Sequence, residues 1–135
     1  MRSAVAFALL LALGTGGAAA APPGCRLHAG DKVVLYSASG DPPSVFAWDS
    51  PVRLRDYNAA NYDEAQAMSN RATLMAPGTR ALVASCRPNY VRSPYSDVPD
   101  DAVGITIITG PYRGHNYWVL ASDVRGVYHP MGKTR

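Results

Sequence analysis

The tail of the chain carries a strand–turn–strand pattern that restricts the fold more than any other stretch. Residues 103–109 read VGITIIT, a run of β-branched residues, and residues 115–121 read HNYWVLA. The five residues between them, GPYRG, contain the glycine and proline that favour a turn. β-Branched and aromatic runs bounded by such residues are typical of paired strands. The pattern therefore predicts a β-hairpin and a mainly β chain.

Short apolar runs separated by turn residues continue through the rest of the chain. We expect further strands at residues 31–38, 45–48, 52–57, 80–86 and 126–129. In the third of these, Val52 and Leu54 alternate with Arg53 and Arg55, which indicates a strand with one solvated face. Strands this short, with no internal repeat, predict one domain built as a small barrel or sandwich.

One segment, at about residues 62–73, predicts a helix. Asn61 is a suitable N-cap, and Glu64 follows three residues later, which is close to the spacing of a capping box. A second irregular segment, residues 87–102, contains three prolines and shows no hydrophobic period. We therefore expect a single inserted helix and one long loop.

Residues 1–20 have the pattern of a secretory signal peptide. Arg2 provides the charge, an apolar run follows, and Ala18 and Ala20 fit the small-residue cleavage rule. We therefore expect an exported protein, periplasmic or secreted, with a single mature domain at residues 21–135. An uncleaved membrane anchor is the alternative, but the apolar run is shorter than the ~20 residues of a spanning helix. We accordingly expect no membrane span.

The sequence has two cysteines, Cys25 and Cys86. Export places them in an oxidising compartment, so we expect a disulfide between them. A bridge closing a loop of about 60 residues stabilises a fold by roughly 4 kcal/mol in the chain-entropy model. Two alternatives stay open: acylation of Cys25, or a metal site made by both cysteines and His28. A zinc site usually shows a second tight ligand pair, and none is visible, so we expect no metal and no cofactor.

Charge and motifs give little sign of nucleic-acid binding or catalysis. The formal net charge of the whole chain is +3, and it falls to +2 when Arg2 leaves with the leader. This charge is too small to indicate a nucleic-acid partner or an anionic membrane. The sequence contains no nucleophile-elbow, zinc-protease or phosphate-loop motif. We expect no enzymatic activity, and a small hydrolase that uses His115 or His129 is the least favoured alternative.

Residues 104–128 resemble the C-terminal half of a Src-homology-3-like barrel, especially the bacterial exported kind. The residues that carry the resemblance read GPYRGHNYWVLASDVRGV, with Trp118 at the family's aromatic position and Val119 at its buried aliphatic position. Residues 121–123 match its 3₁₀ turn, and Val124 matches the valine that opens its last strand. The resemblance implies a small Src-homology-3-like barrel of about six short strands, with the helix and the 87–102 loop inserted between them.

Three positions differ from the family pattern. Tyr117 replaces the glycine before the aromatic residue, and Leu120 replaces the proline after the aliphatic one. Asp123 replaces a tyrosine that stacks on the ligand. A proline-rich ligand is held by a row of aromatic ridges, so these differences weigh against that particular ligand.

Aromatic side chains are the candidates for ligand binding. Because side chains alternate across a strand, Trp118 and Leu120 face away from Val119, toward the side where the family holds its ligand. If the 87–102 loop folds over the hairpin, several rings line a shallow groove; otherwise they only cover the barrel. The predicted ligand-binding residues are Tyr90, Tyr95, Tyr112, Trp118 and Leu120.

These observations predict an exported, non-enzymatic binding module. Its partner would be a cell-envelope peptide, a cell-wall fragment or a protein. The alternative is a structural or inhibitor-type protein that acts through the 87–102 loop.

Overall fold

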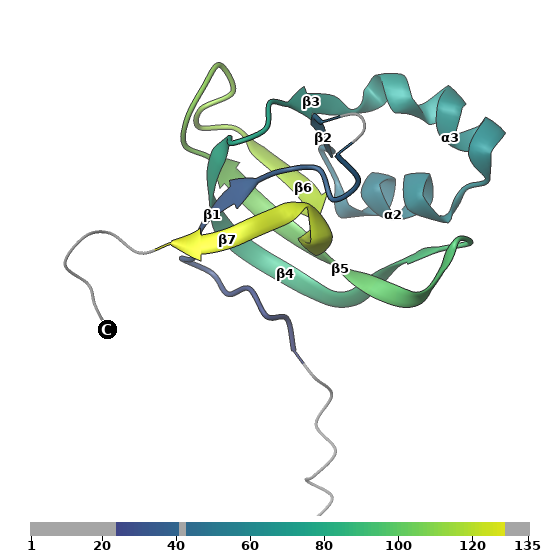
Figure 1. The fold of residues 1–135 in the computed structure, drawn as a ribbon, viewed down its shortest axis with the longest axis horizontal. Coiled ribbons are helices and arrows are strands. Elements are labelled where there is room, and N and C mark those ends of the chain that lie inside the picture. The colour runs from purple at the N-terminus through teal and green to yellow at the C-terminus, as the bar shows by residue number, and fades with distance from the viewer. Residues whose placement is uncertain (1–23, 41–42, 129–135) are drawn as a thin grey trace, which may run out of the picture.

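The computed structural model of the chain describes residues 24–40 and 43–128 (Figure 1). The predicted signal peptide, residues 1–20, and His129 lie outside the described residues. Within the described part, no helix is both long enough and apolar enough to cross a membrane.

Seven strands occur among the described residues, and five of them form one antiparallel sheet with the order β6-β5-β4-β1-β7. These five are β1 (Lys32–Leu35), β4 (Arg80–Ser93), β5 (Ser96–Ile107), β6 (Asn116–Leu120) and β7 (Val124–Tyr128). The other two, β2 (Val45–Ala47) and β3 (Thr73–Met75), form a separate two-stranded sheet. The mainly β prediction is confirmed. Within the described residues β6 and β7 are the outer strands of the larger sheet and do not pair with each other, so this sheet is open.

The predicted tail hairpin is present. β5 and β6 pair in register, with Val103 opposite Val119 and Gly104 opposite Trp118. Gly110 and Gly114, in the turn, have φ values of 87° and 88°, which glycine adopts without the strain of a Cβ. A 3₁₀ helix, η3 (Ala121–Asp123), then leads directly into β7, as expected from the sequence.

The strand predicted at residues 52–57 is wrong. Helix α2 (Pro51–Ala59) occupies this stretch. Ser50 is its N-cap, because the Ser50 side chain accepts a hydrogen bond from the Arg53 backbone N–H, and Pro51 is at the start of the helix, where a missing N–H does no harm. Leu54 is its one fully buried residue. The alternation of apolar and charged residues is therefore the start of a helix with a narrow apolar face.

The prediction of a single helix at about residues 62–73 is correct in place but not in number or length. Helix α3 (Tyr62–Met68) begins with the expected capping box, in which Asn61 and Glu64 exchange side-chain and backbone hydrogen bonds. A 3₁₀ turn, η2 (Ser69–Arg71), follows, and β3 starts at Thr73. Together with α2, the described residues contain two α-helices.

The loop predicted at residues 87–102 is also wrong. This stretch belongs to a long hairpin in which β4 continues to Ser93, a turn occupies residues 94–95, and β5 starts at Ser96. The pairing is irregular between Arg87 and Val91, and Asn89 there has a φ of 52°. Prolines are tolerated in strands at bulges, where a ladder hydrogen bond is already missing. Irregular pairing of this kind interrupts the alternation of inward and outward side chains, so the sequence of these strands shows no hydrophobic period.

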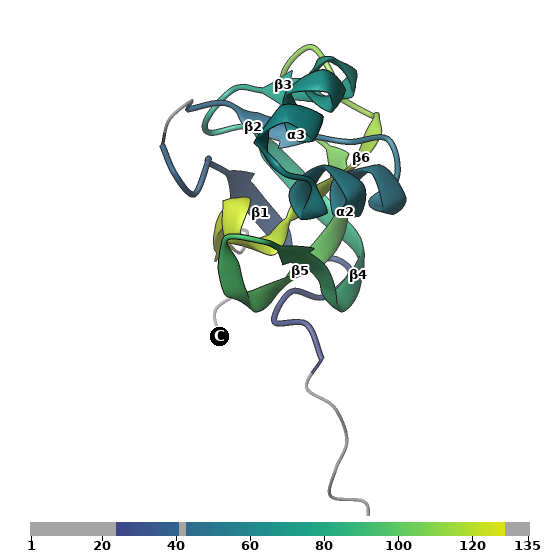
Figure 2. The ribbon, with the colours of Figure 1, turned by 90° about the vertical axis from the view of Figure 1, so that its right-hand side faces the viewer.

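The buried side chains form two clusters. The first core is aliphatic: Leu27, Val33, Leu35, Val45, Ala47, Met75, Ala81, Val83, Val103, Ile105, Ile107, Val119 and Ala121. The second core contains Trp48, Leu54, Val91 and Ala102, with several half-buried aromatic rings packed around them. α2 packs on β4, β5 and β6 above the second core, and α3 contacts α2 at the edge of the molecule (Figures 1 and 2).

The predicted disulfide is present between Cys25 and Cys86, whose Cα atoms are 6.3 Å apart. It ties the segment before β1 to the middle of β4. Leu27, two residues after Cys25, is thereby held against the first core.

Candidate functional site

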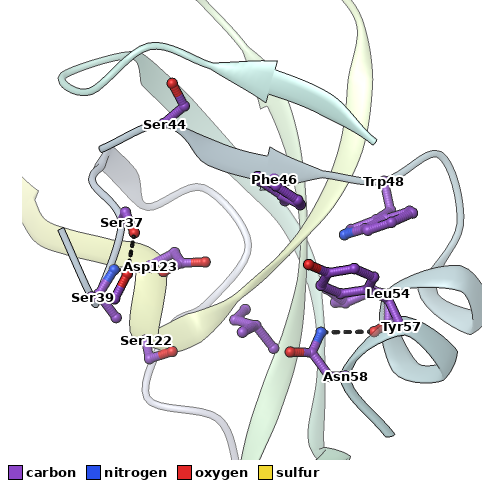
Figure 3. A pocket seen from close by; sticks show the side chains of 12 residues that line it. Ser37, Ser39, Ser44, Phe46, Trp48, Leu54, Tyr57, Asn58, Ser122 and Asp123 are labelled. Carbon is purple, nitrogen blue, oxygen red and sulfur yellow. Dashed lines mark hydrogen bonds between the residues drawn. The ribbon is translucent and has the colours of Figure 1, made fainter. Parts of the chain in front are cut away.

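A cleft of about 260 Å³ lies between the helix α2 and the segment that leaves β1 (Figure 3). One wall is apolar and mostly aromatic: Phe46, Trp48, Leu54, Tyr57 and Leu120. The opposite wall is polar, and its main members are Ser37, Ser39, Ser122 and Asp123. Figure 3 shows the two walls facing each other across the opening. A largely apolar hollow with a few converging polar groups is the usual form of a ligand site.

The aromatic wall is built by β2 and α2. In β2, Val45 and Ala47 point into the first core, so Phe46 between them faces the cleft side. In α2, Tyr57 follows Leu54 by one turn and shares its face. The ring centroid of Tyr57 lies 5.7 Å from that of Phe46 and 4.9 Å from that of Trp48. Burial raises the pKa of the Tyr57 hydroxyl above its ordinary value of 10.0.

Trp48 forms the back of the aromatic wall and is 1% exposed. Its backbone pairs with Trp118 of β6 through two hydrogen bonds, with N···O distances of 2.9 and 2.7 Å. Its indole Nε1, however, is buried and has no acceptor among the described residues. Figure 3 shows this nitrogen edge of the ring turned toward the space between Phe46 and Tyr57. A buried donor without a partner costs about 1–3 kcal/mol.

Asp123 provides the charge of the polar wall. Its Oδ1 accepts a hydrogen bond of 2.8 Å from the Ala38 backbone N–H, and its backbone carbonyl accepts one of 2.9 Å from the N–H of Tyr36. Burial is the main reason that the pKa of the Asp123 carboxyl is raised, and the negative charge of Asp100 adds to the effect. The Ala38 N–H and the guanidinium of Arg125 act in the opposite direction. The two ion pairs found between described residues do not involve Asp123.

Hydroxyl and amide groups complete the cleft. Ser37 Oγ and Ser39 Oγ are 3.2 Å apart and hydrogen-bonded. Asn58, one helical turn after Leu54, donates from Nδ2 to the Leu54 carbonyl at 2.9 Å. This bond orients the Asn58 side chain, and Figure 3 shows its oxygen directed into the cleft. The cleft therefore offers both donors and acceptors around one carboxylate.

Three of the residues predicted to bind a ligand, Tyr90, Trp118 and Leu120, meet on the second core. Trp118 is half-buried, and Val119 is fully buried in the first core, so the expected alternation along β6 is confirmed. The Arg87 guanidinium lies 5.4 Å from the Trp118 ring and 5.1 Å from the Tyr90 ring. Leu120, the third residue, lines the cleft itself. The role of these three side chains in binding remains a prediction.

The other two predicted residues lie elsewhere. Tyr112 is 37% exposed in the β5–β6 turn and packs edge-on against Tyr117, with ring centroids 6.1 Å apart. Tyr117 packs against the first core, whereas its neighbour Trp118 packs against the second. Tyr95 is 75% exposed in the turn between β4 and β5. Five aromatic and aliphatic positions predicted from sequence are thus spread over three places.

Sequence reasoning missed the rings and the carboxylate that define the cleft. Tyr57 was overlooked because residues 52–57 were predicted as a strand. The sequence contained a signal that could have found it: serine followed by proline, Ser50-Pro51, is a typical helix start. That start places Leu54 and Tyr57 on one face. Asp123 was noticed only as a difference from a family pattern.

A metal centre finds little support among the described residues. One group of side chains, Cys25, Cys86 and Asp101, has ligand atoms within 4.8 Å of one another. The two sulfurs are joined in the disulfide, so they offer no thiolate ligand. One carboxylate is left, which is too few donors to hold a divalent cation.

The two histidines that the structure describes are not part of the cleft. The backbone N–H of His28 donates to Asp31 Oδ2, and the ring of His115 lies 6.5 Å from that of Tyr117 in the β5–β6 turn region. The cleft combines a carboxylate and serine hydroxyls without either of these imidazoles. A serine hydroxyl becomes a strong nucleophile only with an adjacent general base.

Comparison with known proteins gives no family for the chain. No family model matches it, and no curated protein or solved structure does so either. Functional inference therefore starts from the cleft and its residues.

Proposed function

We propose that the chain is an exported, non-enzymatic binding module that holds a peptide of the cell envelope in the cleft between Tyr57 and Asp123. The observation that carries the proposal is the indole Nε1 of Trp48, which is buried at the back of an apolar cleft and has no acceptor among the described residues. Buried polar groups in proteins are almost always hydrogen-bonded. The Trp48 donor lacks a partner in the described part of the fold, and the Asp123 carboxylate lies on the opposite wall of the same cleft. A ligand that binds between them would give both groups a partner.

The size of the cleft suits part of a peptide. Its volume of about 260 Å³ is slightly below the ~300 Å³ at which pockets for drug-sized ligands begin. One side chain and its flanking backbone can enter, while the rest of the peptide lies on the surface. The source would be a cell-wall fragment, a free envelope peptide or a segment of a protein partner.

A Src-homology-3-like character is part of this proposal. It is supported by the order of elements at the tail, where the β5–β6 hairpin, the single 3₁₀ turn η3 and the last strand β7 follow one another. Leu120, at the family's proline position, lines the cleft. Export to the periplasm or the medium is supported by the Cys25–Cys86 disulfide, since disulfides persist in oxidising compartments.

A titration of the ¹⁵N-labelled protein with soluble peptidoglycan fragments and with envelope-derived peptides tests the proposal. We expect amide signals of residues 37–39, 57–58 and 120–123 to shift together as one of these ligands is added. Shifts confined to other surfaces, or no shifts at millimolar ligand, would contradict the assignment of the cleft.

The tip of the β4–β5 hairpin supports a second candidate, a structural or inhibitor-type role. Tyr95 is 75% and Val98 74% exposed there, and Figure 1 shows the hairpin extending beyond the body of the sheet. Large exposed apolar side chains at a protruding tip are typical of contact residues. The double variant Tyr95→Ser/Val98→Ser should abolish capture of a protein partner that the Asp123→Asn variant still captures, if this second role is the correct one.

A further inference from the structure

We infer that the cleft selects a peptide side chain that ends in a primary ammonium group, as lysine does, with Asp123 receiving the ammonium. This inference rests on the proposed function and names the ligand chemistry. Three features of the cleft lead to it: a carboxylate without an ion pair, an aromatic wall opposite, and an indole donor without an acceptor.

The carboxylate of Asp123 is half-buried and needs a cation. Among the described residues, its side chain accepts a hydrogen bond from the Ala38 N–H at Oδ1, and neither of the two ion pairs includes it. Taking an ionised carboxylate out of water is costly unless it is paired and hydrogen-bonded. An ammonium group provides the opposite charge and three N–H donors on a slender stem.

Arg125 is a cation whose charge acts on Asp123, and its side chain makes other contacts. Its Nη2 donates to the Ser37 carbonyl at 3.4 Å, and its guanidinium carbon lies 5.9 Å from the centre of the Tyr36 ring. It therefore binds the outer side of the polar wall. Asp100, the other charged group acting on Asp123, is negative and favours a cationic ligand still further.

The opposite wall suits the remainder of a lysine-like side chain. Phe46 and Tyr57 present ring surfaces to the cleft, with Trp48 buried behind them, and aromatic faces attract ammonium groups by cation–π interaction. The four-carbon stem of lysine buries well along apolar surface while its charged end reaches a polar partner. Leu120, which is half-buried on the same wall, provides that surface.

The Nε1 of Trp48 has no acceptor among the described residues and is buried beside Phe46 and Tyr57, so a ligand carbonyl reaches it only when one of these rings moves aside. This nitrogen can only donate, so its partner must be an acceptor such as an amide carbonyl. An amine at Asp123 together with a carbonyl near Trp48 describes a residue within a peptide chain (Figure 3). A ligand of this kind satisfies both incomplete groups of the cleft at once.

Calorimetric titration with three blocked tripeptides tests the inference. The probes are acetyl-Ala-Lys-Ala-N-methylamide, the same peptide with norleucine, and the same peptide with Nε-acetyl-lysine. Norleucine keeps the aliphatic stem and lacks the charge, and Nε-acetylation removes the charge but retains polarity. We expect the lysine peptide to bind the wild-type protein about tenfold or more tightly than either neutral probe, as for one charge-assisted hydrogen-bonded contact.

Two variants of equal charge change locate the effect. In Asp123→Asn the preference for lysine over norleucine should disappear, while Asn still accepts the Ala38 hydrogen bond. In Asp97→Asn, which removes an exposed carboxylate near the hairpin tip, the preference should remain. If Asp123→Asn does not fold, the comparison of the three peptides on the wild-type protein still shows whether the ligand needs an ammonium group.

The outcomes separate the inference from the proposed function. Equal binding of the lysine and norleucine peptides, with cleft amides shifting, overturns the ammonium inference and leaves a peptide-binding module. Failure of all three peptides and of peptidoglycan fragments to shift the cleft amides overturns both. A muropeptide with a free side-chain amine that displaces the lysine peptide supports a cell-wall source, and lysine-peptide binding without such displacement supports a protein source.

Discussion

The two buried clusters on the sheet differ in chemistry and in completeness. The first core holds aliphatic, alanine and methionine side chains, and no polar side chain of the described residues is buried in it. The second core centres on Trp48 and is surrounded by half-buried rings that include Tyr57 and Trp118. The second also contains the buried donor without an acceptor and opens directly into the cleft. The first cluster is therefore fully closed, whereas the second gives up part of its stability where it borders the cleft.

Gly104 connects the two clusters. It lies in β5 opposite Trp118, and a side chain there would contact the six-membered part of the indole ring. The absence of a side chain lets the ring of Trp118 lie flat on the sheet. The aromatic second core thus depends on a close approach that only glycine allows.

The largest expected loss of stability comes from removing the Cys25–Cys86 disulfide, which holds Leu27 against the first core. Replacing both cysteines, as Cys25→Ser/Cys86→Ser, should lower the free energy of unfolding by roughly 4 kcal/mol, because the bridge spans 61 residues of chain. Chemical denaturation of the oxidised and double-variant proteins measures this. A loss well under 1 kcal/mol would mean that Leu27 and its segment add little to the first core.

Replacing a large buried side chain by alanine should lower the free energy of unfolding more in the first core than in the second. Ile105→Ala in the first core should cost about 3 kcal/mol, since surrounding side chains enclose the cavity on all sides. Leu54→Ala in the second core should cost less, about 2 kcal/mol, because its cavity joins an existing cleft into which neighbours can relax. Equal losses in urea unfolding would argue against a difference between the clusters.

Gly104→Ala should cost about 2 kcal/mol by overpacking. A Cβ there would lie 2.9 Å from Ser85 Oγ and 3.1 Å from Trp118 Cζ2, both too close. Trp118 must then lift away from the sheet, so its fluorescence should change along with stability. Ala102 stands two residues before Gly104 on β5. Because alanine is the native residue at that position, the strand backbone itself accepts a Cβ. An unchanged Trp118 environment would refute the close packing.

The smallest expected effect, that of Asp123→Asn, is a gain in stability rather than a loss. The folded-state pKa of Asp123 is raised above its ordinary value of 3.8, chiefly by burial. The folded protein therefore takes up this proton at a higher pH than the unfolded chain, and the contribution of the group to stability is lost as pH rises through the folded-state pKa. Asp123→Asn should then melt slightly above the wild type at pH 7, and the difference should shrink as pH falls toward 3.8. Melting curves at both pH values test this; a variant that melts lower at pH 7 would contradict it.

Prediction from sequence succeeded where local chemistry decides the structure. The Asn61–Glu64 capping box and the Cys25–Cys86 bridge each depend on a few neighbouring residues or on a single possible pair, and the 3₁₀ turn at residues 121–123 followed from the family resemblance. The alternation that sends Val119 inward and Trp118 to the other face is equally local.

Prediction failed where a local pattern has two physical explanations. Alternating Val52, Arg53, Leu54 and Arg55 suits a half-exposed strand, but the Ser50-Pro51 helix start decides for α2. In the β4–β5 hairpin, prolines at bulges gave the impression of a loop. The cleft could not be found because it requires α2, the β1 exit and η3 to meet in space. Hydrophobic periodicity predicts single elements, and it does not predict which distant elements come together in space.

The central claim, that a lysine-bearing peptide completes the second core at the cleft, is tested most directly by the two indole N–H signals in a ¹⁵N NMR titration. Trp48 lines the cleft, whereas Trp118 packs on Gly104 beneath Arg87 and is a control within the same molecule. We predict that the lysine tripeptide moves the Trp48 signal strongly downfield, as its Nε1–H gains an acceptor, and leaves that of Trp118 nearly unchanged. A Trp48 signal that stays in place at saturating peptide would contradict the account.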